Sequence, residues 1–131
     1  MARPKSKILT PAEQRIMDAV WTLRRASVGD VLEAISGAGP VAYTTVMTVL
    51  RVLEKKGYVA ATRDGRILIY RAKVSREKAQ SQALRHLVGE FFAGSRTALA
   101  QHLLHEEDLS RAELQSLQKM VQAALAERKR E

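Results

Sequence analysis

Apolar residues recur at helical spacing in the first part of the chain and predict two short helices there. The first begins at Thr10, because Pro11 suits the first helical position and Glu13 completes a capping box. It should run to about Arg25. A second helix should begin at Ser27 and end in segment 36–40, which contains two glycines and a proline. The expected buried side chains of these helices are Ile16, Met17, Val20, Trp21, Leu23, Val28, Val31, Leu32 and Ile35.

A third helix, predicted from about residue 42 to residue 56, has an apolar stripe and an unusual opposite face. Val46, Val49, Leu50 and Leu53 follow the i, i+3, i+4, i+7 pattern of a packed helix side. The other side carries hydroxyl and basic side chains, and no acid occurs in this helix before Glu54. The residues of that side are Tyr43, Thr44, Met47, Thr48, Arg51 and Lys55.

Two short β-prone runs follow between residues 58 and 72 and flank the pair Asp64-Gly65. An Asp-Gly pair between such runs predicts a β-hairpin with a type I′ turn, since that turn requires positive φ angles. Arg63 and Arg66 should stand at its tip. Three helices followed by a hairpin form the winged helix-turn-helix arrangement, so we predict a mainly α fold with a small β-hairpin wing.

From Ser75 onward the pattern is helical again and predicts three helices, interrupted near Gly94 and restarted by the capping box of Ser110 and Glu113. We therefore divide the chain into a winged-helix domain, residues 1–74, and a helical dimerisation domain, residues 75–131. The apolar sides of these three helices could fold back on the first domain. We favour the alternative that they pack against the same helices of a second chain. The residues expected at the dimer interface are Leu84, Leu87, Val88, Phe91, Phe92, Leu99, Leu103, Leu114, Leu117 and Val121.

The positive charge of the chain is concentrated in its first part. Residues 1–78 hold 15 Lys and Arg against 7 Asp and Glu, whereas residues 79–131 hold seven of each kind. Such a one-sided excess indicates a polyanionic partner. The basic amino end is followed by no apolar run, so we expect neither a secretory signal nor membrane insertion, and a cytoplasmic location.

Placing the third helix in the major groove of DNA explains its acid-free face, because a carboxylate there would meet the phosphate backbone. The hairpin tip and the start of the second helix would reach neighbouring phosphates. An alternative is a winged-helix architectural or protein-interaction module with nonspecific DNA affinity. The residues expected to contact DNA are Ser27, Tyr43, Thr44, Met47, Thr48, Arg51, Lys55, Lys56, Arg63 and Arg66.

Few residues suggest any other chemistry. His102 and His105 precede three acids at a spacing that zinc tolerates, but the acids also suit the start of the next helix, so we expect no metal site. The absence of cysteine excludes disulfides and thiolate sites. No catalytic constellation or phosphate-binding loop is legible, so we predict neither an enzyme nor a cofactor.

Four segments together resemble the penicillinase repressor family over roughly residues 9–125. They are "LTPAEQRIMDAVW", "AYTTVMTVLRVLEKKGYV", "GRILIYRAKVSREKA" and "EEDLSRAELQSL". The resemblance implies a homodimeric repressor that binds inverted repeats with TACA and TGTA half-sites. It assigns base reading to Thr44, Thr45, Met47 and Thr48, although the helical pattern puts Thr45 closer to the core side.

The sequence departs from the family's pattern at two places. Members under a β-lactam sensor are cut by a protease at an Asn-Phe bond, and His102-Leu103 occupies the aligned position here. The resemblance therefore implies a sensor-linked protease as a partner only if another bond is accepted. Copper-responsive members carry a Cys-x-Cys pair, which this chain lacks.

Overall fold

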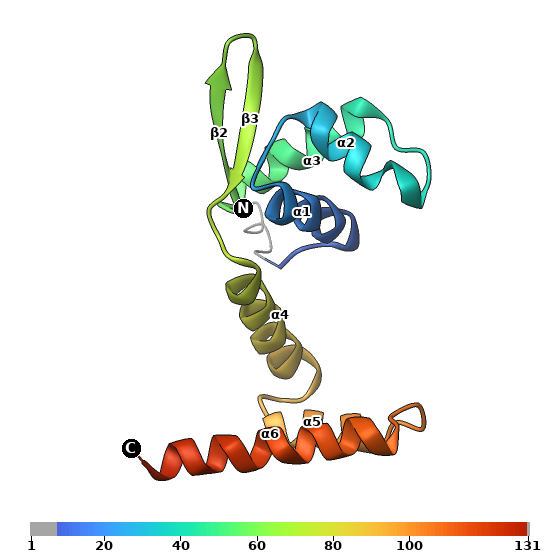
Figure 1. Ribbon diagram of the computed structural model, residues 1–131, viewed down its shortest axis with the longest axis vertical. Coiled ribbons are helices and arrows are strands. Elements are labelled where there is room, and N and C mark those ends of the chain that lie inside the picture. The colour runs from blue at the N-terminus through green and yellow to red at the C-terminus, as the bar shows by residue number, and fades with distance from the viewer. Residues whose placement is uncertain (1–7, 131) are drawn as a thin grey trace. The chain divides into compact units, whose positions relative to one another are not determined.

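The computed structural model describes residues 8–130, and its elements follow the predicted order of three helices, a hairpin and three more helices. The chain divides into two compact units, the first ending at His86 and the second beginning at Leu87 (Figure 1). The elements are α1 (Pro11–Leu23), β1 (Arg25–Ala26), α2 (Val28–Ile35), the 3-10 helix η1 (Ser36–Ala38), α3 (Tyr43–Lys55), β2 (Val59–Asp64), β3 (Ile67–Ala72), α4 (Arg76–Phe91), α5 (Arg96–Leu104) and α6 (Arg111–Lys129).

The first unit is a winged helix, in which α1, α2 and α3 pack around one core that the sheet closes. Both capping boxes expected at helix starts are present, with Glu13 serving Thr10 in α1 and Glu113 serving Ser110 in α6. Leu23 was expected to be buried, but it is 41% exposed because it lies in the last turn of α1, where the chain leaves the core for β1. The largest fully buried side chains are Met17, Val20, Val31, Val46, Leu50, Leu53, Val59 and Tyr70.

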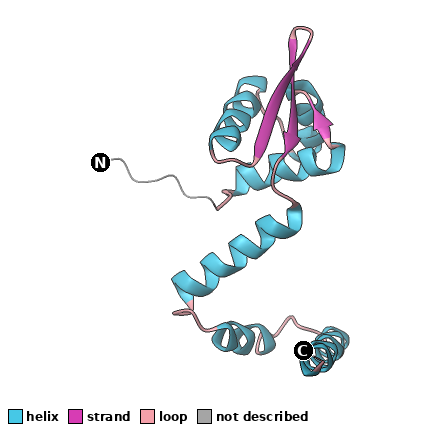
Figure 2. Cartoon of the chain, turned by 90° about the vertical axis from the view of Figure 1, so that its left-hand side faces the viewer, coloured by secondary structure: helices cyan, strands magenta, loops and turns pink. Residues whose placement is uncertain are grey.

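The wing is part of a three-stranded antiparallel sheet with the strand order β1-β3-β2 (Figure 2). β1 was not predicted, because two residues are too short to show an alternating pattern. The hairpin is at the expected place, but Asp64 pairs with Ile67, so the two turn residues are Gly65 and Arg66. Gly65 has a φ of 62°, and Arg66 is not among the described residues with positive φ. This is the type II′ pattern and not the type I′ turn that we predicted.

The first unit extends into α4, beyond the boundary expected after residue 74. Ala79 belongs to the core, and the indole Nε1 of Trp21 donates a hydrogen bond of 2.9 Å to the carbonyl of Val74. The Arg76 guanidinium lies 5.3 Å from the centre of the Trp21 ring. The first half of α4 is therefore anchored on the winged helix rather than on the helices that follow.

The second unit leaves much of its apolar surface uncovered. Phe91 is 74% exposed, and α6 exposes four large apolar side chains, namely Leu114, Met120, Val121 and Leu125. Val88 is an exception to the expected interface, because it is buried within its own chain and has little surface to offer a partner. Phe92 is also half-buried and packs edge-to-face on His102, with the ring centres 5.4 Å apart.

Among the residues that the structure describes, no helix combines the length and the apolar character needed to cross a membrane.

Candidate nucleic-acid interface

A hollow of about 380 Å³ on the first unit gathers most of the basic side chains that the sequence singled out. The start of α2, the exposed side of α3 and the wing contribute to it, and none of the described residues that line it is acidic. Arginines that converge without a carboxylate form a positive surface suited to phosphate. The hollow, which we call the basic hollow, includes Ser27, Tyr43, Met47, Arg51, Arg63 and Arg66.

The side of α3 that borders the basic hollow is exposed over two turns. Tyr43, Thr44, Thr48 and Arg51 are exposed, and Met47 is half-buried against the core. Thr45 is also exposed, so the structure corrects the expectation that it lies toward the core. Lys55 is exposed at the end of the same helix.

One hydroxyl of this face is already engaged within the helix. The Oγ1 of Thr48 donates a hydrogen bond of 2.8 Å to the carbonyl of Thr44, one turn earlier. Its hydroxyl hydrogen is therefore occupied, while its methyl group stays available for an apolar contact such as a thymine methyl.

Ser27 lies at the edge of the basic hollow and caps α2. Its Oγ accepts from the backbone N–H of Asp30 at 3.1 Å, and its own N–H donates to the Asp30 carboxylate at 2.9 Å. These hydrogen bonds hold the pKa of Asp30 below its ordinary value. A hydroxyl that accepts in this way still has a hydrogen to donate, so Ser27 is compatible with a phosphate contact.

The two wing arginines approach the basic hollow from the hairpin. Arg63 is paired with Leu68, and Leu68 packs against the core, so Arg63 stands on the side of the sheet that faces the helices. Arg66 lies in the turn itself. Tyr70 forms part of the floor, and burial raises the pKa of its hydroxyl.

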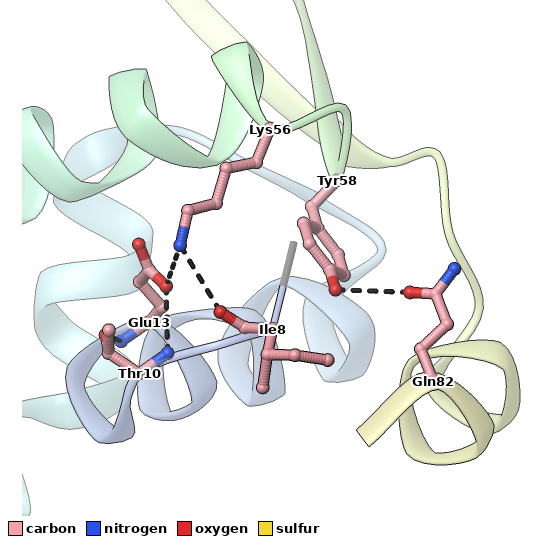
Figure 3. A network of polar contacts seen from close by, with 6 residues as sticks. All are labelled: Ile8, Thr10, Glu13, Lys56, Tyr58 and Gln82. Atoms are coloured by element: carbon pink, nitrogen blue, oxygen red, sulfur yellow. Dashed lines mark hydrogen bonds and ion pairs between the residues drawn. The ribbon is translucent and has the colours of Figure 1, made fainter. Parts of the chain in front are cut away.

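Lys56 does not join this surface, contrary to our expectation that it reaches DNA. Its Nζ lies 2.7 Å from Oε1 of Glu13 and donates at 3.4 Å to the carbonyl of Ile8 (Figure 3). Both charged side chains are only 8% exposed. The spacing of residues in the sequence could not show this contact, because 43 residues separate Lys56 from Glu13 along the chain. Lys56 therefore ties the end of α3 to the start of α1.

His102 lies in the last turn of α5, and His105 is the residue that follows this helix. His102 packs on Phe92, and among the described residues no group of three histidine, aspartate or glutamate side chains is arranged to hold a metal ion.

A winged helix whose third helix and wing share a basic, acid-free hollow defines a DNA-binding regulator of transcription. The chain belongs to the penicillinase repressor family. The model of this family, described as "Penicillinase repressor", matches residues 9–123. Membership makes it a transcriptional repressor that binds DNA and not an enzyme, in agreement with the sequence prediction.

Individual relatives agree with this assignment. The methicillin resistance regulatory protein MecI of Staphylococcus aureus is 23% identical over 117 residues, which cover 89% of this chain and 95% of MecI. The transcriptional regulator BlaI of Mycobacterium tuberculosis is 46% identical over 55 residues, 41% of this chain and 40% of that protein. The solved DNA-binding domain of the repressor BlaI has the same fold, with a TM-score of 0.50 at 22% identity over 58% of this chain and 93% of that domain.

Proposed function

We propose that the chain is a homodimeric repressor that binds an inverted-repeat operator with TACA and TGTA half-sites. α3 would lie in the major groove, with Thr44, Thr45, Met47 and Thr48 toward base edges and Arg51 toward a guanine or a phosphate. The wing arginines would hold the phosphates of an adjacent groove. The observation that carries the proposal is the basic hollow, in which Arg51, Arg63 and Arg66 converge beside the exposed face of α3.

Dimerisation is supported by the uncovered apolar side chains of α4, α5 and α6. Leu84, Leu87, Phe91, Leu103, Leu114 and Val121 belong to the expected interface and are exposed in the single chain. Exposed apolar surface of this extent is typical of an interaction site. Two copies related by a two-fold axis would present two α3 helices to the two half-sites.

The test is a salt series of fluorescence anisotropy on two labelled duplexes, one carrying the inverted repeat and the other the same bases scrambled. A repressor of this kind should prefer the repeat by roughly a thousandfold or more, with two chains per site. Equal affinity with the same steep salt dependence would leave only backbone electrostatics, and the architectural alternative would replace the proposal.

The same assay can decide whether Arg51 contacts a base or only a phosphate. If Arg51 reads a guanine, Arg51→Ala should weaken repeat binding by about 1–3 kcal/mol and reduce the preference over the scrambled duplex. If it contacts only phosphate, both duplexes should lose affinity alike. Unchanged affinity on both would remove Arg51 from the interface.

Relief of repression by proteolysis would require a change in α5. The bond His102-Leu103, at the position where sensor-controlled members are cut, lies inside the helix Arg96–Leu104, and His102 is held by the Phe92 ring. A protease acting there would need this helix to unwind first.

A further inference from the structure

The sheet of the first unit carries a second group of arginines that the basic hollow does not include. Arg25 in β1 and Arg71 in β3 are direct partners in the antiparallel ladder, and both are exposed. Direct partners point their side chains to the same face, about 5 Å apart at Cβ. Neither arginine takes part in an ion pair within the part of the chain that the structure describes. Two like charges in this arrangement destabilise a sheet.

Arg24, which precedes Arg25, has an unfavourable backbone conformation. Arg24 ends α1 with a φ of 70° and a ψ of −49°, a strained backbone conformation close to that of the rare γ-turn. Its side chain is exposed as well. Strain and like-charge repulsion that coincide at one exposed place are typical of a binding surface rather than of a packing solution.

Resting on the proposed function, we infer that Arg25 and Arg71, with Arg24 beside them, form a second phosphate-binding patch for the same operator DNA. The patch adjoins the basic hollow along the chain, because Tyr70 and Ser27 line the hollow while Arg71 and Arg25 lie one and two residues away. Arg71 and Tyr70 are neighbours in a strand, so their side chains point to opposite faces of the sheet. The wing thus presents arginines on both faces.

Two arginine-bearing faces fit a duplex better than they fit an acidic protein segment. A hairpin that enters a groove of DNA has a phosphate strand on either side, and each face of this wing would then meet one strand. Arg71 lies four residues from Ile67, about 13 Å along the strand at 3.3 Å per residue. The patch would therefore reach phosphates other than those beside the hairpin turn. The guanidinium fork matches phosphate geometry.

The test is the double variant Arg25→Thr/Arg71→Thr, since threonine is well accepted in strands. The double variant removes two phosphate contacts per chain, which is four in the complex of two chains with one operator. The slope of log K against log salt should therefore fall by about 3.6, which is about 4,000-fold in affinity at 0.1 M salt if affinities converge at 1 M. The preference for the repeat over the scrambled duplex should stay unchanged, because phosphate contacts carry no sequence information. The thermal midpoint should be unchanged or higher, since a repulsive pair has been removed.

The matched control is Lys78→Ala/Arg85→Ala, which removes the same charge from exposed positions on α4. If both double variants lower the slope equally, the effect is one of net charge, and the patch is disproved. An unchanged slope in the sheet variant would show that the patch faces away from DNA, or that its partner is an acidic protein. Absence of repeat preference in the unaltered protein would instead contradict the proposed operator, and the slope comparison would still decide the patch.

Discussion

At the scale of single residues, the contact with the largest consequence is the ion pair between Glu13 and Lys56. Glu13 caps α1 and is itself 6% exposed, and its Oε1 accepts from both the Thr10 N–H at 2.9 Å and the Lys56 ammonium at 2.7 Å. Burial raises the pKa of the Glu13 carboxyl, but the hydrogen bonds from Lys56 and Thr10 and the Lys56 charge outweigh it, so the net pKa lies below its ordinary value. One carboxylate therefore connects a helix cap to the end of α3.

Removing one partner of this pair should be costly, because the other charge is left buried. We expect Lys56→Met to lower the free energy of unfolding by about 3 kcal/mol, and the double variant Glu13→Gln/Lys56→Met to cost less than the sum of the two single changes. Urea denaturation of the four proteins measures the coupling. Additive losses would mean that the two side chains do not interact.

The same pair predicts a pH dependence. Because the pKa of Glu13 is lowered on folding, its contribution is present above the unfolded value of about 4.3 and is lost as the pH falls through the folded value. The difference in thermal midpoint between the unaltered protein and Glu13→Gln should therefore be largest near neutral pH and shrink below about pH 4.3. A constant difference across that range would contradict the assigned ionisation.

At the scale of elements, the helices differ in how their amino ends are capped. α1, α2 and α6 each begin with a complete capping box, whereas Ala42, the N-cap residue of α3, makes no side-chain hydrogen bond. A cap residue such as aspartate would stabilise α3 but would also place a carboxylate beside the basic hollow. The absence of a cap is thus consistent with a helix whose start is kept free of acid.

Two substitutions at Ala42 separate these effects. Ala42→Ser and Ala42→Asp should each raise the free energy of unfolding by about 1 kcal/mol, because either side chain can accept from the exposed N–H groups. Only the aspartate variant should lose operator affinity, since it repels phosphate. Thermal denaturation and anisotropy on the repeat duplex measure the two quantities. Equal affinity for both variants would show that the start of α3 lies away from the DNA.

At the scale of the whole molecule, stability and DNA binding are expected to depend on different surfaces. The first unit has a closed core of its own, whereas α6 exposes Val121 and Leu125 on one side of the helix by 58% and 66%. Burying those side chains against a second chain would remove apolar surface from water at about 25 cal/mol per Å². Met120, 62% exposed on the same helix, was not among the residues expected at the interface and extends that surface.

Carboxylates placed on the apolar side of α6 should therefore separate the dimer. Val121→Asp/Leu125→Asp should convert the protein to monomers in analytical ultracentrifugation and weaken repeat binding by at least about tenfold, because one half-site is lost. The control Ala123→Asp/Ala126→Asp adds the same charge to the other side of the helix and should remain dimeric. If both variants stay dimeric, α6 does not form the interface.

The sequence alone determined features that depend on neighbours a few residues apart. Helical spacing and the capping box at Thr10 located α1, and Asp64-Gly65 located the hairpin, because capping and turn formation are short-range effects. The acid-free face of α3 and the concentration of positive charge in the first part of the chain also follow directly from the sequence. These two features predicted a DNA-binding protein.

The tertiary structure alone decided which distant side chains meet. Helical spacing places Lys56 on the packed side of α3, three residues after Leu53, but it does not show that its partner is Glu13, 43 residues earlier in the chain. The two residues of β1 form a strand because they pair with β3, and the same pairing places Arg25 opposite Arg71. Val88 is buried within its own chain and Leu23 is exposed, both contrary to expectation, since burial depends on where a neighbouring element ends as well as on periodicity. These contacts are set by packing between segments far apart in the chain, which a pattern of single residues does not encode.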